Sequence, residues 1–284
     1  MLAVVFTLSA AYTPGPAAPL RLVRSRAAVG MAAVETFKPN MMKPNLAVEV
    51  YADADGISAA VVDIVKAESA KAIAAKGSFS MAIPSGSMVK ALTGLSAGDC
   101  EFDKFHVFFV NDFKGGEYVS HPQCVADFSG PCGIPESQVY KHAEMGPAGA
   151  AAYLKTLVDC PATAVETPSS RSSPGFIGGA VDLILLGTGD DGHCGFIFPG
   201  SPELAKTGSG ELVLAAEGGT VTMSMDLINA AGKVVLGAAT AGRAEMVKKA
   251  LKEGKNSGMP TGNVAAKDTV WLTDTDSIAA YKAA

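Results

Sequence analysis

Short apolar runs alternate with stretches of helical hydrophobic spacing from about residue 45 to the C-terminus. Such runs, bounded by glycine or polar residues, predict buried strands, and the stretches between them predict helices. The expected strands open the stretches 46–77, 79–95 and 269–283, fill 105–113 and 181–187, and occur twice within 219–254. Because strands and helices alternate, we expect βαβ units and a Rossmann-like α/β fold, with three αβα layers around a mostly parallel central sheet.

The predicted helices begin near residue 56 and after the Gly/Ser turn at 85–87, cover 147–158, and end the stretches 219–254 and 269–283. A turn is expected between the two strands of 219–254. The chain has 284 residues, of which 48% are hydrophobic and 18% charged, and this composition suits one large core. We therefore expect residues 45–284 to form a single α/β domain.

The first 40 residues have a different composition. An apolar run at residues 1–12 is too short to span a bilayer, three arginines follow it, and no acidic residue precedes Glu35. This order predicts a targeting leader over residues 1–40 and resembles the bipartite leader of plastids acquired by secondary endosymbiosis. We therefore expect the protein to be located in a plastid. The alternative is a cytoplasmic protein, in which these residues are a disordered tail or result from a wrongly assigned gene start.

The charge balance limits the classes of partner. The net charge is −5, and no block of Lys and Arg stands out, so nucleic acid is not expected as a partner. No later apolar run is long enough for a membrane span, and no membrane association is expected of the mature chain. A small anionic substrate remains possible, because a local cationic site can lie in an acidic protein.

The five cysteines are odd in number and lack tight spacing, which favours reduced thiols in the core. Their distribution offers one conceivable zinc set, formed by His121, Cys124, Cys132 and His142. The spacing matches none of the usual zinc patterns, so no metal is expected. The sequence carries no signal for an oligomeric state.

Three polar stretches follow expected strands: Pro84–Ser87, Asn111–Phe113 and Gly187–His193. In an open parallel sheet, ligands bind at the carboxyl ends of the strands. We therefore expect these stretches to share one rim and to form the site. Taken alone, each has a plain structural explanation: a helix cap, a solvated strand end, or a capping or core histidine.

Residues 187–192 formally match the GxGxxG motif of dinucleotide-binding proteins, with Glu211 near the expected place of a ribose-binding acid. That motif must open a helix, whereas Pro199, Gly200 and Pro202 would fall inside it here. We therefore expect neither a dinucleotide nor any other cofactor. The second motif, Ser85-Gly86-Ser87, suits a phosphate through free backbone N–H groups and hydroxyls, or serves as an ordinary helix cap.

The order of several segments resembles the glucosamine-6-phosphate isomerase/6-phosphogluconolactonase family, over roughly residues 45–284. The most specific part is LLGTGDDGHCGFIFPGS, which looks like the family signature Leu-Leu-Gly-x-Gly-x-Asp-Gly-His-x-x-x-x-Phe-Pro. The other segments are PSGSMVKAL (84–92), FHVFFVND (105–112), IPESQVY (134–140), AAAYLKTL (150–157), VTMSMDLINAA (221–231) and VWLTD (270–274). Isomerases and deaminases of this superfamily carry a glutamate where this chain has Phe198, so the lactonase branch fits better.

The resemblance implies hydrolysis of 6-phosphoglucono-δ-lactone in the oxidative pentose phosphate pathway. His193 would act as general base on water, a role that suits imidazole near neutral pH, and Asp191 would position it. Backbone N–H groups of the glycine-rich turn would stabilise the oxyanion. Substrate-binding residues would be Ser85, Gly86, Ser87, Asn111, Asp112, Gly189, Gly192 and Arg243, the last near the usual place of a phosphate-binding lysine.

Several positions depart from the family pattern. The family commonly has Asp-Glu-Arg where this chain has Asn111-Asp112-Phe113, an arginine at Thr220, and a glycine at Ser85. Two cationic phosphate contacts are therefore missing, unless other residues such as Lys90 and Lys114 compensate. A non-catalytic or altered-specificity sugar-phosphate-binding paralogue remains the main alternative, and an amino-sugar-phosphate isomerase or deaminase is the less favoured one.

Overall fold

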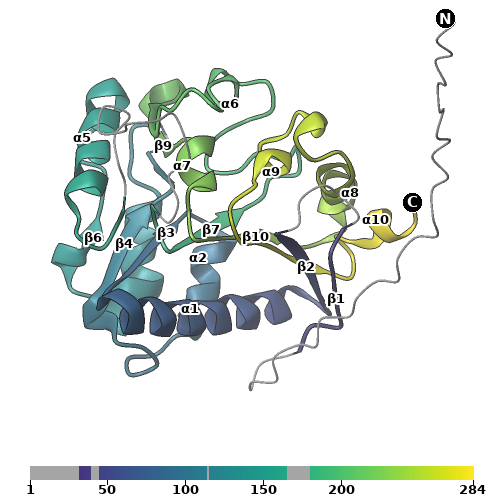
Figure 1. Ribbon diagram of the computed structural model, residues 1–284, viewed down its shortest axis with the longest axis horizontal. Coiled ribbons are helices and arrows are strands. Elements are labelled where there is room, and N and C mark those ends of the chain that lie inside the picture. The colour runs from purple at the N-terminus through teal and green to yellow at the C-terminus, as the bar shows by residue number, and fades with distance from the viewer. Residues whose placement is uncertain (1–31, 40–44, 114, 165–179) are drawn as a thin grey trace, which may run out of the picture.

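Eight strands form one central sheet in the computed structural model, in the order β1-β2-β11-β10-β7-β3-β4-β6 (Figure 1). The structure describes residues 32–39, 45–113, 115–164 and 180–284. All neighbouring pairs are parallel except β1 and β2. The strand bounds are β1 Glu35–Phe37, β2 Leu46–Tyr51, β3 Phe79–Ile83, β4 Phe105–Phe109, β6 Val139–Tyr140, β7 Leu183–Gly187, β10 Lys233–Ala238 and β11 Thr269–Asp274.

Helices cover both faces of this sheet, as the sequence predicted. One face packs against α1 (Ala54–Lys76) and α2 (Ser87–Ala91), and the other against α5 (Gly146–Asp159), α7 (Met225–Asn229) and α8 (Ala244–Glu253). In Figure 1, α1 lies below the sheet and α5, α7 and α8 lie above it. The three-layer αβα architecture with a mostly parallel sheet is therefore confirmed.

The central strand β7 shows why its sequence is continuously apolar. Leu183 and Leu185 face the core on the α1 side, whereas Ile184 and Leu186 face the core on the α5 side. All four side chains are fully buried. A strand covered on both faces has no solvent-facing position, so its sequence does not alternate between apolar and polar residues. The loop that follows β7 is thus carried on a strand that is buried on both faces.

A second, antiparallel sheet was not expected from the sequence. It consists of β5 (Asn111–Asp112), β9 (Val221–Met223) and β8 (Val213–Ala215), in that order. The chain leaves the main sheet after β4, so residues 111 and 112 do not extend the parallel strand as predicted. They pair with β9, and Asp112 lies opposite Val221, which is 109 positions later in the chain. A local sequence pattern does not reveal such a contact.

Three helices differ from their expected extent. The turn expected before β10 is the helix α7, whose N-terminus is capped by the Ser224 side chain accepting from Leu227 N–H. The helix expected after Ser87 is only five residues long before it tightens into a 3₁₀ turn. The C-terminal helix is α10 (Ala279–Lys282). Helix α1 begins close to its predicted start, because Asp53 accepts from Gly56 N–H and caps it.

The predicted leader falls largely on residues 1–31 and 40, which lie outside the described residues. Its described part contains β1, which pairs antiparallel with β2 at the edge of the sheet. Phe37 stacks on Tyr281 with ring centroids 5.6 Å apart, and Glu35 pairs with Lys282 at 2.5 Å. This strand is thus tied to the C-terminal helix α10.

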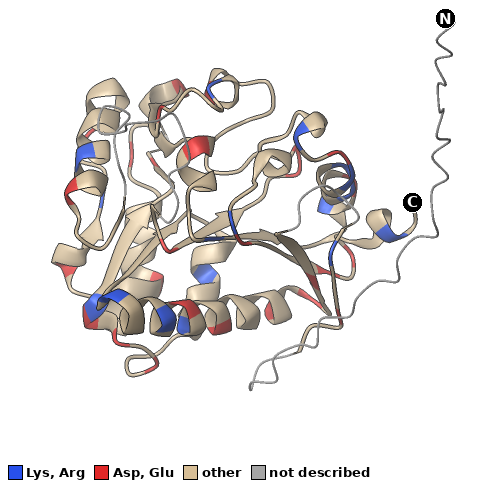
Figure 2. Ribbon diagram, viewed as in Figure 1, with Lys and Arg blue, Asp and Glu red and all other residues tan. Residues whose placement is uncertain are grey.

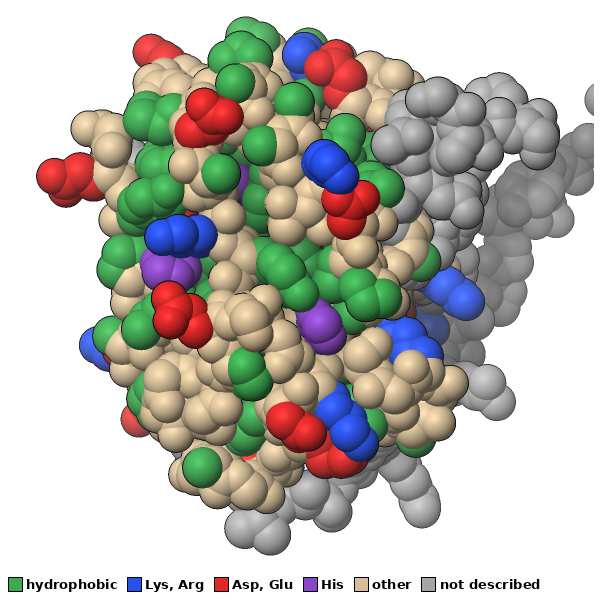
Figure 3. Space-filling model, turned by 90° about the vertical axis from the view of Figure 1, so that its left-hand side faces the viewer, with side chains coloured by type: hydrophobic (Ala, Val, Ile, Leu, Met, Phe, Trp, Pro, Cys, Tyr) green, Lys and Arg blue, Asp and Glu red, His purple; other side chains and the backbone are tan. Residues whose placement is uncertain are grey.

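Basic and acidic side chains are interspersed. Figure 2 shows Lys and Arg next to Asp and Glu along α1 and α8. Figure 3 shows the face at the α5 end, where both basic and acidic side chains are scattered among apolar and polar ones. No helix in the described part of the chain is both long and apolar enough to cross a membrane.

Candidate active site

Two of the three polar stretches lie exposed at one rim, as the sequence predicted, whereas the third, Asn111–Phe113, follows β4 at the same edge but is largely enclosed. Strands β10, β7, β3 and β4 are neighbours in that order and run parallel, so their carboxyl ends share one edge of the sheet. The loop Gly187–His193 follows β7, and the turn Ser85–Ser87 follows β3 beside it. Arg243 comes from the loop after β10, on the other side of the Gly187–His193 loop.

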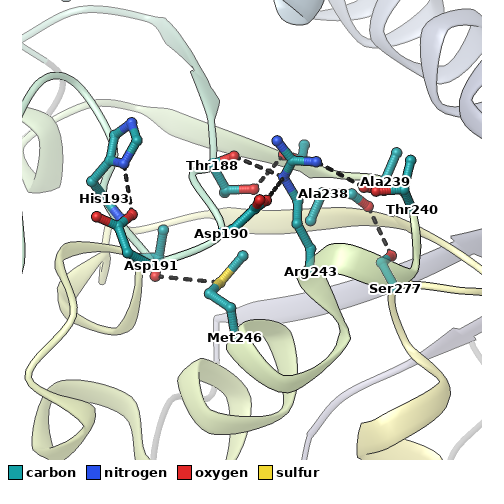
Figure 4. A network of polar contacts seen from close by, with 12 residues as sticks. Thr188, Asp190, Asp191, His193, Ala238, Ala239, Thr240, Arg243, Met246 and Ser277 are labelled. Atoms are coloured by element: carbon teal, nitrogen blue, oxygen red, sulfur yellow. Dashed lines mark hydrogen bonds and ion pairs between the residues drawn. The ribbon is translucent and has the colours of Figure 1, made fainter.

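His193 and Asp191 form a hydrogen-bonded pair at this rim (Figure 4). The ring atom Nδ1 of His193 lies 2.6 Å from Oδ1 of Asp191, which also accepts from the backbone N–H of His193 at 3.0 Å. Burial raises the pKa of Asp191, but the bonds from His193 outweigh it and hold that pKa below its ordinary value. The carboxylate thus favours the tautomer with the proton on Nδ1, which leaves Nε2 as a base.

The two glycines of this loop make room for the pair. A Cβ on Gly189 would overlap the His193 imidazole and also approach the Asp191 carboxylate. Gly192 has φ of +86°, which favours glycine, and a Cβ there would overlap Met259. The loop is closed by Gly189 N–H donating to His193 O at 2.9 Å and Gly192 N–H donating to Gly189 O at 3.0 Å. The glycines therefore serve the placement of His193.

Those internal bonds bear on the expected oxyanion site. The N–H groups of Gly189, Gly192 and His193 are all donated within the loop. They are therefore not free to bind an oxyanion in this conformation, contrary to the role expected for the glycine-rich turn. The sequence motif indicates the residue types but not which N–H groups the loop itself uses.

Phe198 packs on the His193 ring, with centroids 4.6 Å apart. Among the residues that the structure describes, no hydrogen bond engages Nε2 of His193, and 38% of its side chain is exposed. The imidazole is thus held by a carboxylate at one nitrogen and by an aromatic ring against its face, while the other nitrogen is open. Such an arrangement suits a base that takes a proton from a water molecule.

Arg243 binds two residues of the Gly187–His193 loop, Thr188 and Asp190 (Figure 4). Its Nε donates to Thr188 O at 2.8 Å and lies 3.6 Å from Oδ1 of Asp190, and its Nη1 donates to Ala239 O at 3.0 Å. The sequence predicted only a phosphate contact for Arg243. Thr188, its partner in the loop after β7, lies 55 positions earlier in the chain. No local sequence motif indicates a contact over such a separation.

The Ser85–Ser87 turn has the conformation that the motif requires at Gly86, where φ is +84°. Ser85 is half-buried, and Gly86 and Ser87 are exposed at the rim. The turn has one partner that the sequence did not indicate: Gly86 N–H donates to the side chain of Gln123 at 2.7 Å, so this N–H is not free for a phosphate, contrary to the expectation for the motif. Gln123 belongs to α3 (Ser120–Cys124), a short helix between β5 and β6.

Asp112 is buried, and Asn111 is half-buried in β5. Oδ1 of Asp112 accepts from the N–H groups of Phe113, Val119 and Ser120, so this carboxylate fastens the loop that leads into α3. The substrate contact expected for Asp112 has no support in this geometry, because the side chain is fully enclosed. A carboxylate at a strand end is often exposed, and only the fold back onto residues 119 and 120 encloses this one.

The two positions that lack arginine are both buried. Phe113 has φ of +71° and packs on Tyr118 with ring centroids 4.5 Å apart, and its carbonyl accepts from the Thr220 hydroxyl at 2.9 Å. An aromatic cluster occupies this region, and the Lys141 ammonium lies over the Tyr118 ring, 5.6 Å from its centroid. Of the two lysines suggested to compensate, Lys90 is exposed on α2, and Lys114 lies outside the described residues.

The residues of the conceivable zinc set are not assembled into a metal centre. No group of three or more potential ligands forms within residues 32–39, 45–113, 115–164 and 180–284. Burial raises the pKa of Cys124 and of Cys132 to about 11 and lowers the pKa of His142 to about 4. After β7, the dinucleotide motif is likewise not followed by a long helix, since α6 (Pro202–Ala205) has four residues.

A family model and individual relatives in sequence point to the same protein family. A family model described as glucosamine-6-phosphate isomerases/6-phosphogluconolactonase matches residues 52–271. A probable chloroplastic 6-phosphogluconolactonase 3 of rice (subspecies indica) is 27% identical over 230 residues, which are 74% of this chain and 68% of that protein. A 6-phosphogluconolactonase of Rhizobium meliloti is 29% identical over 225 residues, or 74% of this chain and 90% of that protein.

Solved structures show the same fold. A 6-phosphogluconolactonase from Shewanella baltica superposes with a TM-score of 0.65 at 18% identity, covering 83% of this chain and 99% of the other. A monomeric glucosamine-6-phosphate deaminase superposes with a TM-score of 0.62 at 15% identity, covering 82% and 99%. Because both branches match in fold, the site residues have to distinguish them.

Proposed function

This chain belongs to the family of glucosamine-6-phosphate isomerases and 6-phosphogluconolactonases, and from that premise we propose that it hydrolyses 6-phosphoglucono-δ-lactone to 6-phosphogluconate. The relatives from rice and Rhizobium meliloti are named for this activity. The reaction would place the protein in the oxidative pentose phosphate pathway. The observation that supports it most strongly is the His193–Asp191 pair, which has one imidazole nitrogen open at the rim.

In the proposed reaction, Nε2 of His193 takes a proton from water as the water oxygen attacks the lactone carbonyl. The tetrahedral intermediate then collapses, the bond from C1 to the ring oxygen breaks, and the imidazolium returns its proton to that oxygen. One lactone and one water give one hydroxy acid, which ionises. Asp191 holds the ring and stabilises its protonated form, and a general base of this kind contributes typically about 10²–10⁴-fold.

The phosphate end of the substrate would lie between the Ser85–Ser87 turn and Arg243, on the two sides of the His193 loop. The serine hydroxyls would donate hydrogen bonds, and Arg243 would supply a full positive charge through the part of its guanidinium that does not bind Thr188 and Ala239. Lys90 is exposed on the helix that follows the turn and would add a second, more distant charge.

A non-catalytic sugar-phosphate-binding protein is the second candidate. Buried, uncharged Phe113 and Thr220 favour it, because they remove two cations from the phosphate end. The intact His193–Asp191 pair speaks against it. An isomerase or deaminase is disfavoured by Phe198, whose apolar ring lies against His193 where those enzymes carry a carboxylate.

A coupled assay with freshly prepared 6-phosphoglucono-δ-lactone tests the proposal. Formation of 6-phosphogluconate is followed through an NADP-dependent dehydrogenase and corrected for spontaneous hydrolysis. We expect an enzyme-dependent rate proportional to protein concentration. Binding of 6-phosphogluconate without any turnover of the lactone would favour the non-catalytic alternative.

A further inference from the structure

The side-chain amide of Gln123 makes two hydrogen bonds to the backbone of Gly86. Gly86 N–H donates to Oε1 at 2.7 Å, and Nε2 donates to Gly86 O at 3.1 Å and to Oδ2 of Asp127 at 3.2 Å. This network fixes the orientation of the amide, because the reverse orientation would place Oε1 against two acceptor oxygens. Gln123 therefore holds both polar groups of the central residue in the Ser85–Ser87 turn.

Gly86 adopts φ of +84° and ψ of −145°, a conformation open mainly to glycine. A glycine loses more conformational freedom on ordering than other residues, so this turn needs external bonds to hold one shape. Within the adjoining helix, Gly86 O accepts from Lys90 N–H at 3.1 Å, whereas the Gly86 N–H is held from a separate segment by Gln123.

The position of Gln123 is itself fixed by the neighbouring strand end. Asp112 accepts from Val119 N–H at 2.8 Å and from Ser120 N–H at 2.9 Å, at the start of α3. The Ser120 hydroxyl donates to Asn111 O at 2.7 Å. The stretch after β4 thus sets the helix that carries Gln123, and Gln123 sets the turn after β3.

We propose that Gln123 is a positioning residue for phosphate recognition. By holding Gly86 it keeps the Ser85 and Ser87 hydroxyls in the arrangement that binds the anionic end of the substrate, in a chain whose Phe113 offers no charge. Affinity is gained because the turn is ordered before the ligand arrives. This inference rests on the proposed function, since it assigns the phosphorylated end of that substrate to the Ser85–Ser87 turn.

The decisive variant is Gln123→Ala. Loss of two hydrogen bonds to the turn should raise KM for 6-phosphoglucono-δ-lactone by about tenfold and weaken 6-phosphogluconate binding, measured by calorimetry, by a similar factor. The kcat value, and KM for unphosphorylated glucono-δ-lactone, should stay unchanged. A residue needed only for folding would not separate the two lactones in this way.

Gln138→Ala is the matched control. The Gln138 amide donates to Asp103 O and to Phe105 O, both at 2.9 Å, near the amino end of β4 and so away from the rim. This variant also removes a glutamine that binds two backbone groups. It should lower the melting temperature without changing either KM value.

Gln123→Glu tests the chemistry of the contact. A carboxylate can still accept from Gly86 N–H, but it cannot donate to Gly86 O, and it adds a negative charge beside Asp127 and the expected phosphate. We expect the KM for the phosphorylated lactone to rise further than in Gln123→Ala. A smaller rise than with alanine would contradict the proposed proximity to the anion.

The inference is overturned if Gln123→Ala leaves the affinity for 6-phosphogluconate unchanged, if it shifts both lactones equally, or if the wild-type protein binds no 6-phosphogluconate. If the wild-type protein binds 6-phosphogluconate but does not hydrolyse the lactone, the proposed function fails. In that case the affinity of the Gln123 variants alone decides whether the positioning role holds.

Discussion

The imidazole of His193 is held in place by one charged neighbour and one apolar neighbour. A carboxylate binds Nδ1, and the aromatic ring of Phe198 packs against the ring. The loop achieves this within ten positions, from Gly189 to Phe198, because two glycines let it close on itself. This compactness explains why the motif was readable from the sequence: nearly all the residues that place His193 are close to it in the chain.

We expect His193→Ala to lower kcat by about 10²–10⁴-fold with the fold intact, because the base is removed while the loop bonds to its backbone remain. Kinetics combined with circular dichroism check this. Asp190→Asn is the control, since this neighbouring carboxylate contacts Arg243 and not the imidazole. A His193→Ala protein with near-wild-type kcat would refute the proposed mechanism.

Arg243 donates hydrogen bonds to two backbone carbonyls, and we also propose that it binds the phosphate of the substrate. Arg243→Ala should raise KM for the phosphorylated lactone steeply and also lower the melting temperature, because Thr188 O and Ala239 O lose their donor. Arg243→Lys should restore part of the KM, since a point charge still pairs with phosphate, but less of the stability. An unchanged KM in Arg243→Ala would show that the phosphate lies elsewhere.

The buried aromatic cluster changes what the sequence alone suggested for Phe113. Comparison with the family pattern predicts that Phe113→Arg would improve phosphate binding. In the structure this ring is enclosed beside Tyr118 and 6.2 Å from the ring centroid of His142. A charged side chain there would lose its hydration and would not fit the packed aromatic cluster, so the substitution should destabilise the fold.

His142, a member of this cluster, makes the stability of the fold depend on pH. It is fully buried, its ring nitrogens have no hydrogen-bond partner among the described residues, and burial lowers its pKa to about 4. An unfolded histidine titrates near pH 6.5, so between about pH 6.5 and 4 the unfolded chain binds the extra proton. The stability that depends on neutral His142 is complete above that window and is lost as the pH falls through it.

We therefore expect the free energy of unfolding to fall by up to roughly 3 kcal/mol between pH 6.5 and 4 on account of this one group. In His142→Phe, which keeps an aromatic ring against Tyr153, the decline over this range should be shallower. Urea unfolding at several pH values measures both proteins. Equal slopes for the two would show that His142 does not titrate in this window.

At the scale of elements, the sequence predicted what local patterns determine. The βαβ alternation and the buried β7 followed from apolar runs, because a strand covered on both faces has a sequence with no polar positions. The second sheet and the contact from Gln123 to Gly86 did not follow, since each joins segments far apart in the chain, 37 positions in the latter case. Helix α7 has a local signal, the Ser224 cap, but its short length makes the same residues compatible with a turn.

Strand β1 gives a prediction at this scale. The sequence alone suggests that a chain starting near Asn45 would be as stable as the full chain. The structure places Phe37 in the core, stacked on Tyr281, and pairs β1 with β2. A protein starting at Asn45 loses this strand, and the burial of one aromatic side chain is worth about 1.5–3 kcal/mol.

A protein starting at Ala32 should therefore melt like the full chain, whereas one starting at Asn45 should melt roughly 3–10 °C lower. Calorimetry on both proteins checks this. Phe37→Ala in the protein that starts at Ala32 should reproduce most of the loss. Equal melting temperatures for the two shortened proteins would show that β1 adds nothing to stability.

At the scale of the whole molecule, two regions of the chain differ in composition. Residues 52–271 match the family model, and the described structure from β1 to α10 encloses this range. The preceding residues carry the leader-like composition. The relative in rice is named as chloroplastic. We propose that the leader directs this chain to a plastid.

A fluorescent reporter fused to residues 1–40 tests that proposal in an alga with a plastid of secondary origin. We expect the reporter to enter the plastid, because an apolar run followed by a basic, acid-free stretch is the order that two successive targeting steps require. Replacing the three arginines by glutamate in the same fusion should stop the reporter before the plastid interior while leaving the apolar run intact. If the unmodified fusion stays in the cytosol, the localisation proposal fails, whereas the proposed lactonase activity, which depends on His193 and its rim, does not.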